Sequence, residues 1–286
     1  MSASASILLG IFSMLGFGVA DFIAKTMLTK TNVIRTALIS QCIGSILYLV
    51  AALAYDRALP SVGVVGLALF SGAISGAVLC GYYVALSLGK ASLVTPIFSC
   101  LTVVAVVLSF LVLGEALTRL QLSAIALVFV GILLVAFERN YGGDWSRKLS
   151  LILAFSAAVL AGGNLILQKW IAESGHYLMG FLLTRISMPA LMIPLALAPG
   201  QETRSVSNST DWLKLGLLGL IDVSGFFAWY LGLRVGLVSI VTPIATSSPA
   251  VTVLLAHLFL KERVYSHQRI GILAIISGII LLSAIS

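Results

Sequence analysis

Two charged residues lie deep within long apolar segments, Arg185 within 177–198 and Asp222 within 212–235. A charge in an apolar membrane segment is costly, so such residues usually mark a substrate or ion path. A buried Arg–carboxylate pair that neutralises both charges is the alternative. Arg185 and Asp222 are therefore the leading candidates for binding a substrate or a proton, and the purely structural pair stays open.

Four further polar residues lie on helical faces inside apolar segments. Asp21 and Lys25 are one helical turn apart near the end of the first segment, so they could pair at the membrane interface. Asp21 could instead carry a proton. Asn164 and Gln168 are also one turn apart, and they add hydrogen-bonding capacity to the sixth segment. These side chains extend the candidate site without deciding its chemistry.

The elements that must position these residues are membrane-spanning helices. Apolar residues make up 60% of the 286 residues, charged residues only 9%, and the mean hydropathy is +1.12. A spanning helix needs about 20 apolar residues, so we predict an all-α membrane protein with ten spans and no soluble domain. The predicted spans are 6–28, 34–55, 62–87, 93–113, 119–137, 150–172, 177–198, 212–235, 239–260 and 268–285.

The net charge of +7 would suggest nucleic acid in a soluble protein, but here the expected source is charge in the membrane loops. We therefore expect contact with membrane lipid and none with nucleic acid. Twelve Lys and Arg residues follow odd-numbered spans and four follow even-numbered spans. By the positive-inside rule, this bias predicts that both termini lie outside.

The sequence contains an internal duplication. A shift of 147 residues, extended by a weaker shift of 144, pairs Thr95 with Thr242, Pro96 with Pro243, Glu115 with Glu262 and Gly131 with Gly278. We therefore predict two five-helix repeats, residues 1–140 and 150–286. Because five is odd, the second repeat enters the membrane from the opposite side, which predicts an inverted repeat with the substrate site between the halves.

The paired signature residues have structural interpretations. The two prolines are expected in the first turn of their helices, where a missing N–H costs little, although the exposed backbone there could contribute to a substrate site. The two glutamates are expected at interfacial helix ends beside basic residues, as solvated ion pairs or caps, with a proton-carrying role as the alternative. The residues assigned a structural role are Thr95, Pro96, Glu115, Thr242, Pro243 and Glu262.

The duplication also relates the two central charges to neutral residues. Gln41 corresponds to Arg185 at a shift of 144, and Ser75 corresponds to Asp222 at a shift of 147. The two halves therefore offer polar groups at matching depths, which favours a cavity with one charged and one neutral wall. The candidate substrate- or proton-binding residues are Arg185, Asp222, Asp21, Gln41, Ser75, Asn164 and Gln168.

The sequence resembles the drug/metabolite transporter superfamily, in the branch with two EamA-type domains. The resemblance rests on the Thr-Pro signatures at 93–96 and 240–243, the following glutamates Glu115 and Glu262, and the glycine in each next span. It implies a multi-pass transporter in the plasma membrane, whereas its bacterial members usually have both termini in the cytoplasm. The resemblance therefore disagrees with the charge bias on orientation.

These observations predict a secondary transporter that moves a small metabolite or drug-like solute by alternating access, as a monomer or weak homodimer. A phosphate-binding loop, a zinc-ligand spacing and a nucleophile elbow are all absent from the sequence. We therefore expect neither enzyme activity, nor a cofactor, nor a metal. The alternatives are a non-transporting membrane sensor or partner subunit and, with less support, an intramembrane enzyme.

Overall fold

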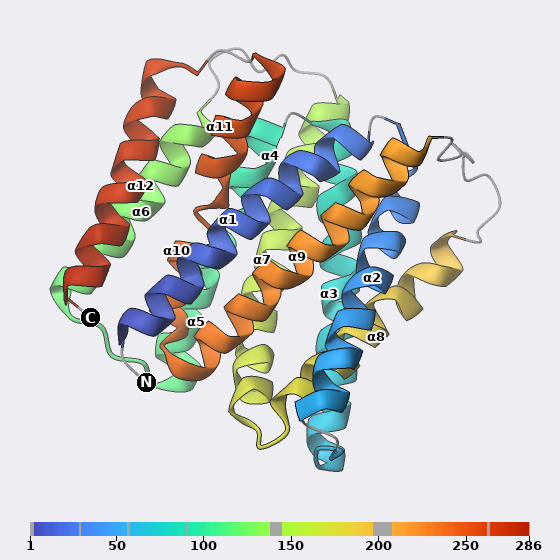
Figure 1. Cartoon of the computed structure of the whole chain (residues 1–286). Helices are drawn as coiled ribbons and strands as arrows, with labels where there is room; N and C mark the ends of the chain where they lie inside the picture. Colours follow the sequence, from blue (N-terminus) through green and yellow to red (C-terminus); the bar gives the residue numbers. More distant parts are fainter. Residues whose placement is uncertain are drawn as a thin grey trace.

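The computed structural model describes residues 3–28, 30–55, 58–89, 91–137, 145–196, 208–261 and 264–285. Within these ranges every regular element is an α-helix (Figure 1). The helices are α1 (Ala3–Leu28), α2 (Val33–Tyr55), α3 (Val62–Leu88), α4 (Ala91–Phe98), α5 (Leu101–Leu113), α6 (Arg119–Ala136), α7 (Trp145–Glu173), α8 (Tyr177–Ala196), α9 (Ser209–Val235), α10 (Val238–Ala245), α11 (Ser248–Leu260) and α12 (Ser266–Ile285).

These helices fit ten membrane crossings, because the predicted fourth and ninth spans are each built from two helices. Among the described residues, six helical stretches are long and apolar enough to cross a membrane, and shorter apolar helices accompany them. One of the six, Val238–Phe259, runs through both α10 and α11. Both ends of the chain lie at the same end of the bundle (Figure 1), as an even number of crossings requires.

The two broken spans change helical geometry at matching positions. In the ninth span, Thr246 and Ser247 have φ/ψ near −77°/0° and −75°/4°. The amide of Ser247 donates to the carbonyl of Ile244, a tighter i→i−3 bond, and Cys100 does the same to Ile97 in the fourth span. The breaks also meet, because the Ser99 hydroxyl donates to the Thr246 carbonyl at 2.7 Å.

Helix boundaries repeat along the chain with the spacing of the duplication. The starts of α3, α4, α5 and α6 each recur 147 residues later, as the starts of α9, α10, α11 and α12. A buried contact recurs with them. The Lys25 ammonium donates to the carbonyls of Leu86 and Gly89 at the end of α3, and its counterpart Lys169 donates to those of Leu233 and Gly236 at the end of α9. Each lysine thus supplies donors to carbonyls at a helix C-terminus, where intrahelical partners run out.

Close backbone contacts hold the bundle together where lipid supplies no hydrophobic drive. α6 packs along α12, and α1 along α9 (Figure 1). A Cβ atom at Gly131 would lie 2.7 Å from the carbonyl oxygen of Gly271, and one at Gly72 would lie 2.3 Å from that of Thr184. Only glycine permits these two approaches, the second of which sets α8 against α3 beside Arg185.

Candidate substrate-binding cavity

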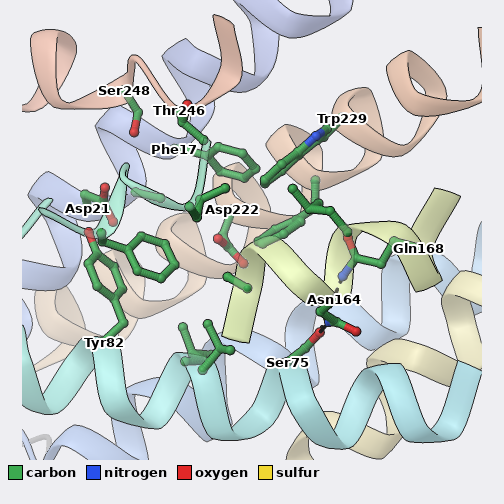
Figure 2. A pocket seen from close by; sticks show the side chains of 18 of the residues that line it. Phe17, Asp21, Ser75, Tyr82, Asn164, Gln168, Asp222, Trp229, Thr246 and Ser248 are labelled. Carbon is green, nitrogen blue, oxygen red and sulfur yellow. Dashed lines mark hydrogen bonds between the residues drawn. The ribbon is translucent and has the colours of Figure 1, made fainter. Parts of the chain in front are cut away.

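One cavity lies at the centre of the bundle, between α3 and α7 on one side and α1, α2, α8 and α9 on the others. The two helix breaks also reach it, through Ser99 and Thr246. Figure 2 shows the cavity from close by. Its wall includes all seven residues chosen from the sequence as binding candidates: Asp21, Gln41, Ser75, Asn164, Gln168, Arg185 and Asp222. The structure thus brings these side chains together, and their role in binding stays a prediction.

Arg185 and Asp222 form a buried ion pair that Gln41 bridges. The Arg185 Nη1 lies 3.7 Å from Asp222 Oδ2 and donates to Gln41 Oε1 at 2.5 Å. The amide nitrogen of Gln41 then donates to Asp222 Oδ2 at 3.3 Å. The bridging residue is the repeat counterpart of Arg185, so the charged wall and the neutral wall meet in this network.

Aromatic rings enclose the Arg185 guanidinium. Its central carbon lies 4.0 Å from the centre of the Phe226 ring and 5.7 Å from that of Tyr48. The side chain is fully buried. Within the described part of the chain, its Nε and Nη2 have no hydrogen-bond partner. Among the described residues, the contacts that hold Arg185 include the ion pair with Asp222, the hydrogen bond to Gln41 and cation–π contacts, and the phenol groups of Tyr48 and Tyr230 also interact with it.

The neutral wall is a cluster of two amides around one hydroxyl. The Asn164 amide nitrogen donates to the Ser71 carbonyl at 3.1 Å and to the Ser75 hydroxyl at 2.8 Å, and the Gln168 nitrogen lies 3.5 Å from the same hydroxyl. Since a carbonyl can only accept, the bond to Ser71 fixes which end of the Asn164 amide is nitrogen. Both amide oxygens lack partners among the described residues.

Asp21 faces the cavity and does not pair with Lys25. The Lys25 ammonium instead donates hydrogen bonds to carbonyls at the end of α3. The interfacial Asp21–Lys25 ion pair that the sequence allowed is therefore not formed. The Tyr82 hydroxyl lies next to the Asp21 carboxylate (Figure 2). No Lys, Arg or His within the described ranges forms an ion pair with Asp21.

The prediction that the signature prolines lie in a first helical turn is wrong. α10 begins at Val238, so Pro243 is its sixth residue, and Pro96 is likewise the sixth residue of α4. The missing N–H therefore falls just before each break, where the helix ends two residues later. Thr95 reaches the cavity, whereas Thr242 is fully buried beside Pro243.

Glu115 is a cap for a helix of the other half, and it is not solvated as the sequence suggested. Its carboxylate accepts hydrogen bonds from the Val238 amide at 2.9 Å, the Ser239 amide at 3.0 Å and the Ser239 hydroxyl at 2.5 Å. These groups form the first turn of α10, where an anion also meets the positive end of the helix dipole. Its counterpart Glu262 lies outside the described residues.

Sequence reasoning missed the aromatic part of the wall. Phe17, Tyr82, Phe226 and Trp229 line the cavity, and the ring centre of Phe17 lies 4.7 Å from Phe226 and 5.2 Å from Trp229. A signal was present in the duplication, because Tyr82 pairs with Trp229 at the shift of 147. In apolar segments, however, aromatic residues are indistinguishable by pattern from core residues.

Comparison with known proteins agrees with this fold. The model of the EamA-like transporter family matches residues 4–137 and again residues 148–284. The structure thus belongs to a class of helical multi-pass membrane transporters. The chain is a member of the EamA-like transporter family, within the drug/metabolite transporter superfamily.

The individual proteins to which this chain is similar match it at low sequence identity or over only part of its length. Protein PecM of Dickeya dadantii is 25% identical over 187 residues, which are 64% of this chain and 61% of PecM. Uncharacterized protein MJ1333.1 of Methanocaldococcus jannaschii is 48% identical over 64 residues, 22% of this chain and 47% of that protein. One known crystal structure, of a protein whose function is not stated, superposes on 99% of this chain and 98% of its own chain. The TM-score is 0.78 and the sequence identity is 17%. That likeness shows the fold alone.

Proposed function

We propose that this protein is a secondary transporter that carries a small organic solute through the central cavity by alternating access, without ATP. The observation that carries the proposal is the cavity wall, to which both halves contribute at equivalent positions. Gln41 and Arg185, Ser75 and Asp222, and Tyr82 and Trp229 all line it. A site shared by two related halves is the arrangement from which rocking of one half against the other exposes it to each side in turn.

We also propose that the halves, residues 1–140 and 150–286, are related by inversion. The repeated helix boundaries support a duplication, and so do the two successive matches of the family model. Since 64 residues are 47% of the archaeal relative, that protein is about half as long as this chain. With five crossings in each half, the second copy has the opposite direction in the membrane.

The site and partner assignments follow from this mechanism. Arg185, Asp222 and Asp21 would bind the solute or a coupled proton, and Gln41, Ser75, Asn164 and Gln168 would orient it through hydrogen bonds. The protein would act in the plasma membrane as a monomer or weak homodimer, surrounded by lipid.

Orientation is proposed from charge. The bias of twelve against four basic residues favours both termini outside, against the usual arrangement of bacterial relatives. Lys25 and Lys169 hydrogen-bond to helix ends inside the bundle, so both can be left out of the count of loop charges. This removes one basic residue from each side of the membrane, and the bias remains. The charge bias favours a cytoplasmic location for the loop after the fifth span. In the variant Trp145→Cys, near this loop, an impermeant thiol reagent applied to intact cells should therefore leave the introduced cysteine unmodified.

Alternating access predicts that one cavity position can be reached from both sides of the membrane. Cysteine in place of Ser75 provides that position, after Cys42, Cys80 and Cys100 are replaced by alanine. We expect an impermeant methanethiosulfonate to modify it in right-side-out and in inside-out vesicles. The control is cysteine in place of Ser87, an exposed residue near the end of α3, which we expect to react from one side only. Modification of the Ser75 variant from one side alone would contradict alternating access.

A further inference from the structure

We propose that the cavity binds a monovalent organic cation: a protonated amine on a flat apolar body with a hydrogen-bond donor at its far end. The inference rests on the proposed function, because it names the substrate class of the same cavity. Three features of the wall carry it, namely the balance of charge, the aromatic surface and two unpartnered acceptors.

The charges that line the cavity do not cancel. Arg185 and Asp222 neutralise each other across 3.7 Å. Asp21 is the third charged residue of the wall, and within the described ranges no cation pairs with it. An uncompensated carboxylate away from bulk water is unfavourable, and a ligand cation would compensate it. With Asp21 ionised, the cavity as a whole therefore favours a charge of +1 on its ligand.

The surroundings of Asp21 suit an ammonium group on a flat body. The Tyr82 ring stacks on Phe98 with centres 4.3 Å apart, and both rings line the cavity. Phe17 lies between Asp21 and Trp229 (Figure 2). Aromatic faces attract cations, most strongly where water is excluded. The same faces provide a surface on which an aromatic ligand can stack.

The opposite side of the cavity requires hydrogen-bond donors from a ligand. Figure 2 shows Asn164 and Gln168 across the cavity from Asp21. Both side chains are at least nine-tenths buried, and both amide oxygens lack a partner in the described structure. Leaving a buried acceptor unpaired costs free energy. An N–H or O–H at the far end of the ligand would satisfy them.

An anionic ligand is the competing possibility, because Arg185 Nε and Nη2 and Trp229 Nε1 are unpartnered donors in the described residues. The charge balance opposes it. The Arg185 charge is already matched by Asp222, so a carboxylate would gain no uncompensated cation in the cavity wall, and it would be repelled by Asp21 whenever Asp21 is ionised. A zwitterion, which would use Asp21 and Arg185 together, is a distinct outcome of the test below.

Four indole compounds of similar shape and different charge separate these ligands: tryptamine, tryptophan, indole-3-acetate and 3-methylindole. Thermal unfolding of the purified full-length protein in detergent reports binding, because a ligand stabilises the folded state by mass action. We expect tryptamine to bind at least tenfold more tightly than each of the other three. Phenethylamine lacks the far N–H and should bind more weakly than tryptamine, and Asn164→Leu, which removes one of the two acceptors, should reduce that difference.

Asp21→Asn keeps the side-chain size and removes the charge. It should weaken tryptamine at least tenfold and leave 3-methylindole unchanged, since only the cation uses the carboxylate. The matched control is Glu173→Gln, an exposed carboxylate outside the cavity that pairs with Lys169 at 3.2 Å. Its tryptamine affinity should stay within twofold of wild type. If Asp21→Asn does not fold, the order of the four probes on the wild-type protein still decides.

Tighter binding of tryptophan or indole-3-acetate, or no response to any of the amines, would overturn the inference. These results are independent of alternating access. A Ser75→Cys variant modified from both sides with no amine binding would retain the transporter and reject the cation. Amine binding with access from one side only would retain the cation site and reject the transporter.

Discussion

Replacing Arg185 by Met and Asp222 by Leu together is expected to give a folded, stable protein that no longer transports. Each single replacement strands the opposite charge in a buried site without its ion-pair partner, although Gln41 can still hydrogen-bond it, which costs about 3–5 kcal/mol. The double replacement removes both charges, so thermal stability should return to near the wild-type value. Counterflow of the indole probes into proteoliposomes should remain at background, because the Arg185–Gln41–Asp222 network that shapes one wall of the cavity is gone even though Asp21 remains.

A second ion pair provides the control for this experiment. Lys30 and Asp211 lie 3.0 Å apart with the lysine half exposed, and neither lines the cavity. Because the Lys30 end of this pair is open to solvent, which weakens an ion pair, and the double variant leaves no buried charge unpaired, Lys30→Met/Asp211→Leu should lose little thermal stability and keep its flux. Wild-type flux in the Arg185→Met/Asp222→Leu variant would show that the buried pair is structural and would remove both residues from the binding site.

Gly72→Ala is expected to lower thermal stability and to disturb the site. A Cβ atom there would lie 1.7 Å from the Ser187 hydroxyl and 2.3 Å from the Thr184 carbonyl oxygen. The hydroxyl can rotate away, but the carbonyl belongs to the backbone of α8, so α8 itself must shift. Overpacking of this kind costs about 1–3 kcal/mol, and the shift moves Arg185, the next residue along α8.

Gly66 on the same helix is the matched control, because a Cβ atom there meets no described atom within 4 Å. Gly66→Ala should leave the melting temperature unchanged or raise it slightly, since alanine favours helix. Equal melting temperatures for the Gly72→Ala and Gly66→Ala variants would show that the α3–α8 contact has more room than the structure gives it. The measurement needs no ligand.

The positions of the spans could be predicted from the sequence because lipid demands long apolar runs. Span ends such as Leu113 and Val235 coincide with observed helix ends. The seven binding candidates could be chosen for the same reason, since polar residues in an apolar run need a special environment. The duplication also favours one shared cavity, because it places repeat counterparts such as Gln41 and Arg185 at matching depths in the membrane. Both residues line the cavity.

Other features depend on contacts that no local pattern contains. Apolar periodicity is the same for one long helix and for two helices joined by a tight turn, so the breaks beside Ser99 and Thr246 were missed. Glu115 caps α10 from more than 120 residues away in the chain, whereas its own neighbours suggested a solvated ion pair or cap at the end of its own helix. Lys25 similarly favours carbonyls of α3 over the nearby Asp21, because the helix end offers two acceptors.

The movement of α3 against α9 tests the central claim most directly. The two helices are repeat counterparts, and both line the cavity, through residues such as Ser75 and Asp222. Spin labels at Val62 and Arg234 report their separation at the end that holds the termini. Labels at the equivalent positions, Ser209 and Ser87, report it at the opposite end. All four residues are exposed.

Double electron–electron resonance spectroscopy of each spin-labelled pair in lipid nanodiscs gives the distance distribution at each end of the bundle. Alternating access predicts a short and a long distance for each pair, and a shift in opposite directions at the two ends when tryptamine is added. Populations at the two ends should therefore be complementary. A single unchanged distance at each end, or widening at both ends together, would contradict the account.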